Sequence, residues 1–289
     1  MMDEVICGTF SSGREQPWSR DYVRVVSWNI ERGLQFSAIL DFLRFAKADL
    51  ILLQEVDLNV RRTQYLDVGY ELARSLRLNY VFGKEFQELS AGCSLSPAYH
   101  GLATLSPWPM SNGRIIRFRR QSNFWKPRWY MPQIALFQRR LGGRISLVAD
   151  ALIDHQRSVT YNLHLESRGK DSLRLDQLGE TLEDARGQSE PALVIIAGDF
   201  NLNAGNDCAA ATFRTLGFHD GVGLLEVPTT VSCGLFQRKR SIDWIYVSGE
   251  VRSDGQVHNT VRASDHYPIS ATFARPWRHG AQARRHQAG

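Results

Sequence analysis

The segment IIAGDFNLNAG, residues 195–205, places a carboxylate and an amide directly after a run of apolar residues. The apolar run is typical of a buried strand, whose interior has little use for Asp199 or Asn201. In open α/β sheets, ligands bind in the crevice beyond the strand ends. The two side chains therefore predict a polar site at such an end, with partners to be found elsewhere in the chain.

Further polar side chains stand at, or just beyond, the ends of other apolar runs. They are carboxylates, an amide and imidazoles, with no thiolate among them: Asn29, Glu31, Glu55, His164, Asp243, Asp265 and His266. Each alone has a structural alternative, such as a turn cap, a surface ion pair or a hydrogen-bonded core histidine. As a set of hard ligands they suit Mg²⁺, Mn²⁺ or Ca²⁺ rather than zinc. A divalent cation held by carboxylates beside two histidines can polarise a phosphoryl oxygen and a leaving group.

Alternating strand and helix patterns must position these residues. Strands are predicted over residues 23–30, 49–56, 79–83, 101–106, 192–200, 241–248 and 267–273, with an antiparallel hairpin joining 144–153 to 158–167. Helices are predicted over 36–48, 65–76, 172–186 and 207–216, the first with Ser37 available near its start. Because no repeat or Gly/Ser linker interrupts the pattern, it favours one α/β domain over residues 21–274, with helices outside two packed sheets.

Composition places the chain among ordinary globular proteins. It is 43% hydrophobic and 22% charged, and no run approaches the ~18 apolar residues of a membrane span. Residues 1–20, a predicted N-terminal tail, have early acids and no apolar stretch, which speaks against a secretory signal. Cys7, Cys93, Cys208 and Cys233 are isolated, so we expect reduced thiols in a cytoplasmic protein, without disulfides or zinc.

Positive charge is concentrated in two segments. Residues 114–144, the basic stretch, contain nine Lys or Arg and no acid, and residues 275–289, a predicted disordered basic tail, add four Arg and no acid. The net charge of the whole chain is +5, so without these thirteen cations the other residues carry a net charge of −8. This asymmetry indicates a phosphate-bearing partner more strongly than the total charge does. The structural alternative is a solvated basic loop and a frayed tail.

Several short motifs occur in one order between Val23 and Phe273. They are SWNIERG, LLQEVD, HGLATLSPWP, NLHLES, AGDFN, SIDWIYVS and SDHYPI. With them the chain resembles the endonuclease/exonuclease/phosphatase superfamily, the deoxyribonuclease I-like hydrolases. GDFN alone is a weak signal, whereas the ordered set is specific. The resemblance implies an α/β (α+β) four-layer sandwich, two packed mixed β-sheets flanked by helices, with the site at one edge.

The resemblance also implies a metal-binding group and metal-dependent hydrolysis of a phosphate ester. Glu55 would be the principal ligand of a divalent cation. Asn29 and Glu31 would lie beside it, and Asp265 would complete the shell. Mg²⁺ is the expected ion, with Mn²⁺ or Ca²⁺ as alternatives.

For the reaction, the resemblance implies in-line attack of water on phosphorus. His266 would be oriented by Asp243 and would activate or electrostatically steer the water, which Asp199 would hold. Asn201 would donate to a non-bridging phosphate oxygen, and His164 would contact the scissile phosphate and could protonate the leaving oxygen. Charge builds on the oxygens on both sides of phosphorus, so a cation, an amide and an imidazolium around them lower the barrier.

The family comprises nucleases, sphingomyelinase-type phospholipid hydrolases, inositol-phosphate phosphatases and members that have lost catalysis. His164 stands where abasic-site nucleases of the exonuclease III type have a tyrosine, which favours the deoxyribonuclease I and sphingomyelinase side. The CDR sequence of the inositol phosphatases is absent from the corresponding place, where the chain has SIDW.

The basic stretch discriminates best between the remaining classes. Its cations interleave with aromatic residues, and we predict that Arg119, Arg120, Trp125 and Arg128 bind substrate. Cations can follow a phosphate backbone while rings stack on unpaired bases, at ~1–3 kcal/mol per base. The same mixture could bind a phospholipid surface, or the aromatic residues could be core. We predict a nuclease, with nucleic acid as partner and no obligate protein partner. The alternatives are a phospholipid phosphodiesterase, a small-molecule phosphatase and a non-catalytic phosphate-binding module.

Other conspicuous residues are interpreted as structural. His100 is expected in a turn, with a place at the rim of the site as the alternative. Asp57, Arg61 and Arg62 are expected to form a surface ion pair, which contributes little stability. Trp244 lies on a predicted strand next to a site residue, so we expect it to face the opposite side and enter the core.

Overall fold

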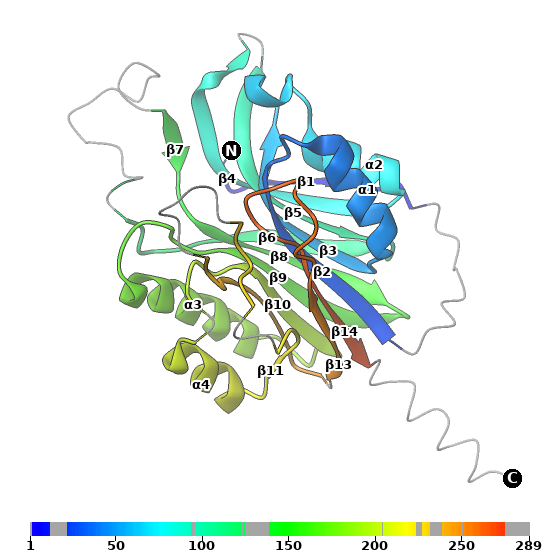
Figure 1. The fold of residues 1–289 in the computed structure, drawn as a ribbon, viewed down its shortest axis with the longest axis vertical. Helices are drawn as coiled ribbons and strands as arrows, with labels where there is room; N and C mark the ends of the chain where they lie inside the picture. Colours follow the sequence, from blue (N-terminus) through cyan, green and yellow to red (C-terminus); the bar gives the residue numbers. More distant parts are fainter. Residues whose placement is uncertain are drawn as a thin grey trace, which may run out of the picture.

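Two β-sheets packed face to face form the centre of the molecule, with helices on both outer faces (Figure 1). The computed structural model describes residues 2–11, 22–93, 96–122, 124, 139–203, 205–223, 227–231, 239–249 and 251–274. The predicted layered sandwich of two mixed sheets between helices is confirmed.

The first sheet contains most of the amino-terminal strands. Within the described residues its order is β1-β4-β5-β3-β2-β14-β13, with β7 beside β4. Strands β2 and β3 are parallel, and the other neighbours are antiparallel. The strands are β1 (Val5–Gly8), β2 (Tyr22–Arg32), β3 (Leu50–Leu58), β4 (Asn79–Cys93), β5 (Ser96–Ser106), β7 (Arg140–Gly142), β13 (Val251–Val257) and β14 (Ile269–Ala274).

The second sheet has the order β11-β12-β10-β9-β8-β6 among the described residues. Strands β9 and β10 are parallel, and the other neighbours are antiparallel. The strands are β6 (Met110–Arg117), β8 (Ile145–Ile153), β9 (Gln156–His164), β10 (Leu193–Asp199), β11 (His219–Asp220) and β12 (Asp243–Val247).

Helices cover the outer face of each sheet. The helices are α1 (Phe36–Ala46), α2 (Val68–Leu76), α3 (Asp171–Arg186), α4 (Asp207–Thr215) and a 3-10 turn at Arg61–Thr63. Helices α1 and α2 pack on the first sheet, and α3 and α4 on the second (Figure 1). In α1, Ile39, Leu43 and Ala46 recur at helical spacing and are buried. The residue before α1 is Gln35 and no side chain caps the helix, so Ser37 lies inside the first turn and is not a cap.

The facing sides of the sheets change from apolar to polar along the strands. In β10, Ile195 and Ala197 lie in the core between the sheets, and Asp199 follows two positions on. Because strand side chains alternate between faces, Asp199 points to the same inter-sheet side. Trp244 on β12 faces the helix-covered side and stacks on Phe200, with ring centroids 4.8 Å apart, which confirms its predicted direction.

A layer of buried amides lies between this apolar core and the polar strand ends. Gln54 Nε2 on β3 donates to Asn162 Oδ1 on β9 at 2.8 Å, which joins the two sheets. Asn162 Nδ2 donates to the carbonyl oxygens of Leu53 and Ala103, each at 3.0 Å. Both amides are fully buried, so an amide that lost its partner would remain unsatisfied at a cost of ~1–3 kcal/mol. The layer therefore fixes one sheet against the other directly below the site.

Several strands extend beyond the predicted ranges or were not predicted. Strand β4 is longer than the predicted 79–83, and β1, β6, β7, β11 and β13 have no sequence-based counterpart. Strand β6, MSNGRIIR, is half-buried at a sheet edge and lacks an alternating apolar pattern. Val5–Gly8, placed in the predicted tail, pairs with β4.

The predicted tail 275–289 lies outside the described residues. No helix among the described residues has the length and apolar character needed to cross a membrane.

Candidate active site

Side chains from both sheets meet at the polar end of the strands. Asn29, near the end of β2, donates through Nδ2 to Glu55 Oε1 at 3.4 Å and to Asp199 Oδ2 at 3.2 Å. Glu55 belongs to the first sheet and Asp199 to the second. A single amide therefore joins the two halves of the site, and the structure brings these three predicted residues together.

A buried Asp–His pair lies beside Asp199. His266 Nδ1 lies 3.0 and 2.9 Å from the carboxylate oxygens of Asp243, and its Nε2 lies 3.8 Å from Asp199 Oδ2. A carboxylate can only accept, so Nδ1 donates. Burial lowers the pKa of His266, but the charges of Asp243 and Asp199 outweigh it and raise the pKa to about 10. Near neutral pH this ring is an imidazolium, suited to stabilising negative charge.

A tight turn follows β10. Asp199 Oδ1 accepts from the backbone N–H of Asn201 at 2.8 Å. Asn201 has a φ of +49°, a left-handed conformation that asparagine adopts more readily than most residues. Its Nδ2 donates to the carbonyl of Leu165 at 3.2 Å, and Arg240 donates to the carbonyl of Asn201 at 3.0 Å. One oxygen of Asp199 thus fixes the turn while the other faces the site.

His164 ends β9 next to a carboxylate and a guanidinium that the sequence analysis did not identify. Its Nδ1 lies 3.3 Å from Glu85 Oε2, and its Nε2 lies 3.6 Å from Asp199 Oδ2. Arg144 Nη1 lies 2.7 Å from Glu85 Oε1 and 2.8 Å from the ring nitrogens. Burial lowers the pKa of Arg144, but Glu85 outweighs it, so the pKa is raised and the guanidinium stays charged. This part of the site therefore holds a charged guanidinium, paired with Glu85, beside His164.

A second part of the site, the acidic wall, gathers the carboxylates of Glu31, Glu55 and Asp265. Glu31 N donates to Asn29 Oδ1 at 3.1 Å. Burial, followed by the charges of Asp265 and Glu55, raises the pKa of Glu31, although Arg32 opposes the shift. Such mutual repulsion is what a bound cation relieves, and carboxylate oxygens are the ligands that Mg²⁺ and Mn²⁺ prefer. The residues present therefore fit a divalent cation.

Asp199, Asp243 and His266 form another group whose ligand atoms lie within 4.8 Å of one another. A metal ion there would compete with the hydrogen bonds between His266 Nδ1 and Asp243. Because these bonds are short and buried, we interpret this group as a proton-handling pair rather than a metal site.

Two interpretations of neighbouring residues were wrong. His100 is not in a turn: it lies on β5, is 1% exposed, and has Nδ1 3.0 Å from Asp57 Oδ1. Asp57 is fully buried and binds Arg62 through contacts of 2.6 and 2.7 Å, so this pair is not on the surface. Leu102 lies in the inter-sheet core two positions after His100, and this alternation could have placed His100 on the same face.

The described part of the basic stretch packs against the second sheet. Phe118 is 2% exposed in its outer core and is unavailable for stacking on bases. Arg119 and Arg120 are exposed and form ion pairs with acidic residues of α3. Such exposed pairs are weak and leave the cations accessible. Trp125 and Arg128 lie outside the described residues.

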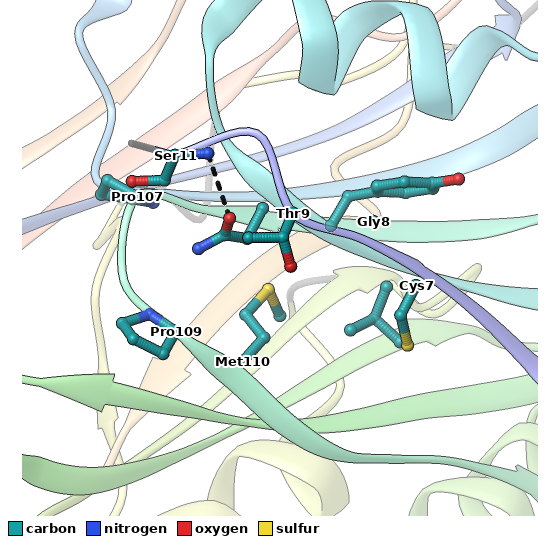
Figure 2. A pocket seen from close by; sticks show the side chains of 10 residues that line it. Cys7, Gly8, Thr9, Ser11, Pro107, Pro109 and Met110 are labelled. Carbon is teal, nitrogen blue, oxygen red and sulfur yellow. Dashed lines mark hydrogen bonds between the residues drawn. The ribbon is translucent and has the colours of Figure 1, made fainter. Parts of the chain in front are cut away.

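A separate pocket lies toward the other end of β4 and β5 (Figure 2). Its volume is about 180 Å³, and its lining includes Cys7, Asn79, Tyr80 and Met110. None of its described lining residues has a carboxylate or an imidazole, and burial raises the pKa of the Cys7 thiol. The pocket therefore lacks groups suited to phosphate hydrolysis, and the strand-end site is the candidate active site.

Comparisons with known proteins agree with the fold. A family model described as the endonuclease/exonuclease/phosphatase family matches residues 26–266. Crystal structures with the same fold include an endonuclease/exonuclease/phosphatase from Beutenbergia cavernae DSM 12333 (18% identity, 88% of this chain and 72% of that chain, TM-score 0.62). TDP2 from C. elegans (21%, 88% and 75%, 0.59) and the human Nocturnin catalytic domain with bound sulfate anion (16%, 94% and 97%, 0.60) are also similar. No curated protein matches the sequence.

Proposed function

Because the chain belongs to the endonuclease/exonuclease/phosphatase family, whose members are metal-dependent phosphoester hydrolases, we propose that residues 21–274 form a phosphodiesterase that cleaves nucleic acids. One observation carries the proposal: Asn29 binds Glu55 in one sheet and Asp199 in the other. The acidic wall and the proton-handling pair are thereby parts of one site.

In this proposal the acidic wall holds the cation. Glu55 is the principal ligand, and Asn29, Glu31 and Asp265 complete the set. Burial raises the pKa of Glu55, but nearby positive groups, His100 first among them, outweigh burial and lower it far below its usual range. Glu55 is therefore ionised near neutral pH. When bound, Mg²⁺ or Mn²⁺ (Ca²⁺ being a weaker candidate) withdraws charge from phosphoryl oxygens.

Asp199 is the residue placed to orient the attacking water and to accept the proton that the water loses. Its Oδ2 faces Asn29, His164 and His266, so a water hydrogen-bonded there lies among groups that stabilise negative charge. His266, held as an imidazolium by Asp243, contacts a non-bridging phosphoryl oxygen, and the Asn201 amide turns from the Leu165 carbonyl to do the same. A preorganised donor such as His266 contributes ~2.7–4 kcal/mol to transition-state stabilisation.

His164 lies on the side of the site from which the leaving oxygen departs in this proposal. Its ring is held between Glu85 and Arg144, so its position is fixed before substrate arrives. A proton carried by His164 passes to the departing oxygen as the bond to phosphorus breaks. Arg144 offers a positive group to the same oxygen.

A surface contact between Arg168 and Phe124 is compatible with a nucleic-acid substrate. The guanidinium of Arg168 lies 5.1 Å from the ring centroid of Phe124, which is 62% exposed. Arg168 follows His164 closely in the chain. A flat ring beside a cation is suited to an unpaired base and its phosphate. We propose that Arg119, Arg120, Trp125 and Arg128 extend this surface. The sulfate bound by Nocturnin is a tetrahedral anion like phosphate.

The experiment is a substrate panel with Mg²⁺ or Mn²⁺ and with EDTA. Single-stranded and duplex DNA, RNA, sphingomyelin, phosphatidylcholine and a phosphomonoester are offered to purified wild type and to Asp199→Asn. We expect metal-dependent cleavage of a nucleic acid that the variant lacks. Turnover of a lipid alone would refute the substrate class and leave the phosphodiesterase. Binding of substrate without turnover under any metal would favour the non-catalytic module.

A cytoplasmic location is part of the proposal. Cys7 and Cys208 are exposed free thiols among the described residues, which is compatible with a reducing compartment.

A further inference from the structure

His100 is a buried residue of the site that the proposed mechanism leaves without a role. It comes from β5 and is 1% exposed. Its Nε2 lies 4.0 Å from Glu55 Oε2 and 3.9 Å from Glu85 Oε2. Polar atoms at such separations interact directly after a small shift or through one bridging water. The ring therefore faces the principal carboxylate of the acidic wall.

The direction of this ring is fixed from behind. Nδ1 lies 3.0 Å from Asp57 Oδ1, and Arg62 binds both oxygens of Asp57 at 2.6 and 2.7 Å. Arg62 also donates to Glu88 at 3.0 Å, and Arg140 binds Glu88 at 2.8 Å. Since a carboxylate accepts, Nδ1 must donate to Asp57, which leaves Nε2 for the carboxylates of Glu55 and Glu85. A continuous chain of opposite charges thus runs to the back of the site.

Glu55 needs such support because its backbone departs from regular strand geometry. It has a φ of +55°, and the pairing of β3 with both neighbours shifts register around it. Asn29 binds Oε1. Among the described residues, Oε2 has Arg32 as an ion-pair partner, at 3.7 Å with a third of its side chain exposed, and His100 at 4.0 Å. Of these two partners, only His100 is buried and held in place by another group.

We propose that His100 is a positioning residue: held by Asp57, it fixes the Glu55 carboxylate, directly or through one water, in the orientation that binds the divalent cation. This rests on the proposed function. Partners of metal ligands commonly contribute ~10–100-fold to metal affinity, because they orient the ligand before the ion arrives.

The test measures Mn²⁺ affinity of the full chain without substrate, by calorimetry and by the electron paramagnetic resonance signal of free Mn²⁺. His100→Ala should weaken binding ~10–100-fold. Substitution of His100 by Asn or by Gln distinguishes the roles of the two ring nitrogens. The Gln amide reaches the position of Nε2, whereas the shorter Asn amide reaches only the position of Nδ1. His100→Gln should therefore retain more affinity than His100→Asn. His219→Ala, on an exposed histidine of β11, should bind as wild type does.

Equal Mn²⁺ affinity in wild type and His100→Ala would overturn the proposal. So would a higher affinity in His100→Asn than in His100→Gln, because the contact with Asp57 alone would then matter. If His100→Ala unfolds, as judged by circular dichroism, the Gln and Asn variants decide. Failure of wild type to bind Mn²⁺ would instead overturn the proposed metal-dependent function, which separates the two outcomes.

Discussion

The molecule contains two buried Asp–His pairs that are alike in geometry and differ in what lies behind the aspartate. In both, Nδ1 faces an aspartate and Nε2 faces a carboxylate of the site, Asp199 at 3.8 Å from His266 and Glu55 at 4.0 Å from His100. Asp57 also binds Arg62, whereas no arginine is paired with Asp243 among the described residues.

This difference separates two uses of one motif. Asp243 is not shared with a guanidinium, so its charge acts on His266 and contributes to the raised pKa of that ring. The charge of Asp57 is divided between a guanidinium and a ring. We infer that Asp243 keeps His266 as an imidazolium for the reaction, whereas Asp57 holds the ring of His100 in position.

The largest expected effect comes from the first pair. His266→Ala should lower turnover of the cleaved substrate ~10²–10⁴-fold, because it removes the imidazolium from the phosphoryl oxygens. Initial rates at saturating substrate measure this, and His219→Ala serves as the matched histidine control. A rate within threefold of wild type, roughly the scatter of such assays, would exclude His266 from the proton and charge chemistry.

The pH dependence of stability should report the first pair. The pKa of His266 is raised to about 10 in the folded protein, against ~6.5 in the unfolded chain. The contribution of charged His266 to the free energy of unfolding is therefore fully present below pH ~6.5 and is lost as pH rises through about 10. Urea unfolding of the metal-free protein at pH 6, 8 and 10 should show the advantage of wild type over His266→Gln shrinking with pH. A constant difference would contradict this assignment.

Arg62→Met tests the support behind His100. It should lower the free energy of unfolding by ~1–3 kcal/mol, because the buried carboxylate of Asp57 loses its bidentate partner. The partial exposure of Arg62 keeps the effect below that of a fully buried pair. Arg74→Met, in the exposed pair with Glu71, should change it by no more than ~0.5 kcal/mol. Equal losses in urea titrations would show that burial of Asp57 carries no special cost.

The smallest effects belong to cations outside both pairs. Arg120→Ala should leave unfolding within ~0.5 kcal/mol of wild type. If Arg120 contacts a phosphate, the variant should bind nucleic acid less tightly, with a salt dependence reduced by ~1 in log–log slope. Hydrolysis of a small phosphodiester should not change. An unaltered slope in a titration with single-stranded DNA would remove Arg120 from the substrate surface.

The sequence predicted what depends on local pattern. Asp199 follows an apolar run and Asn29 ends another, so both could be assigned to strand ends from the chain alone. Glu85 and Arg144 could not. Glu85 lies in the interior of β4, and Arg144 precedes β8 without any alternation that marks it as buried. Their place in the site depends on which strands become neighbours, and those pairings join distant segments.

Local pattern also misjudged environment. Asp57 and Arg62 are close in sequence and of opposite charge, a combination usually found in solvent. Their burial follows from β5 and β4, which cover the carboxyl end of β3 and supply His100 and Glu88. Neither contact can be predicted from the residues next to Asp57 and Arg62 in the sequence.

The amide that spans the two sheets has a consequence for how activity arises during folding. Each sheet alone holds only part of the catalytic group, so a chain with complete secondary structure and undocked sheets would be inert. Recovery of turnover after dilution from denaturant would then report the final packing step, later than the return of circular dichroism.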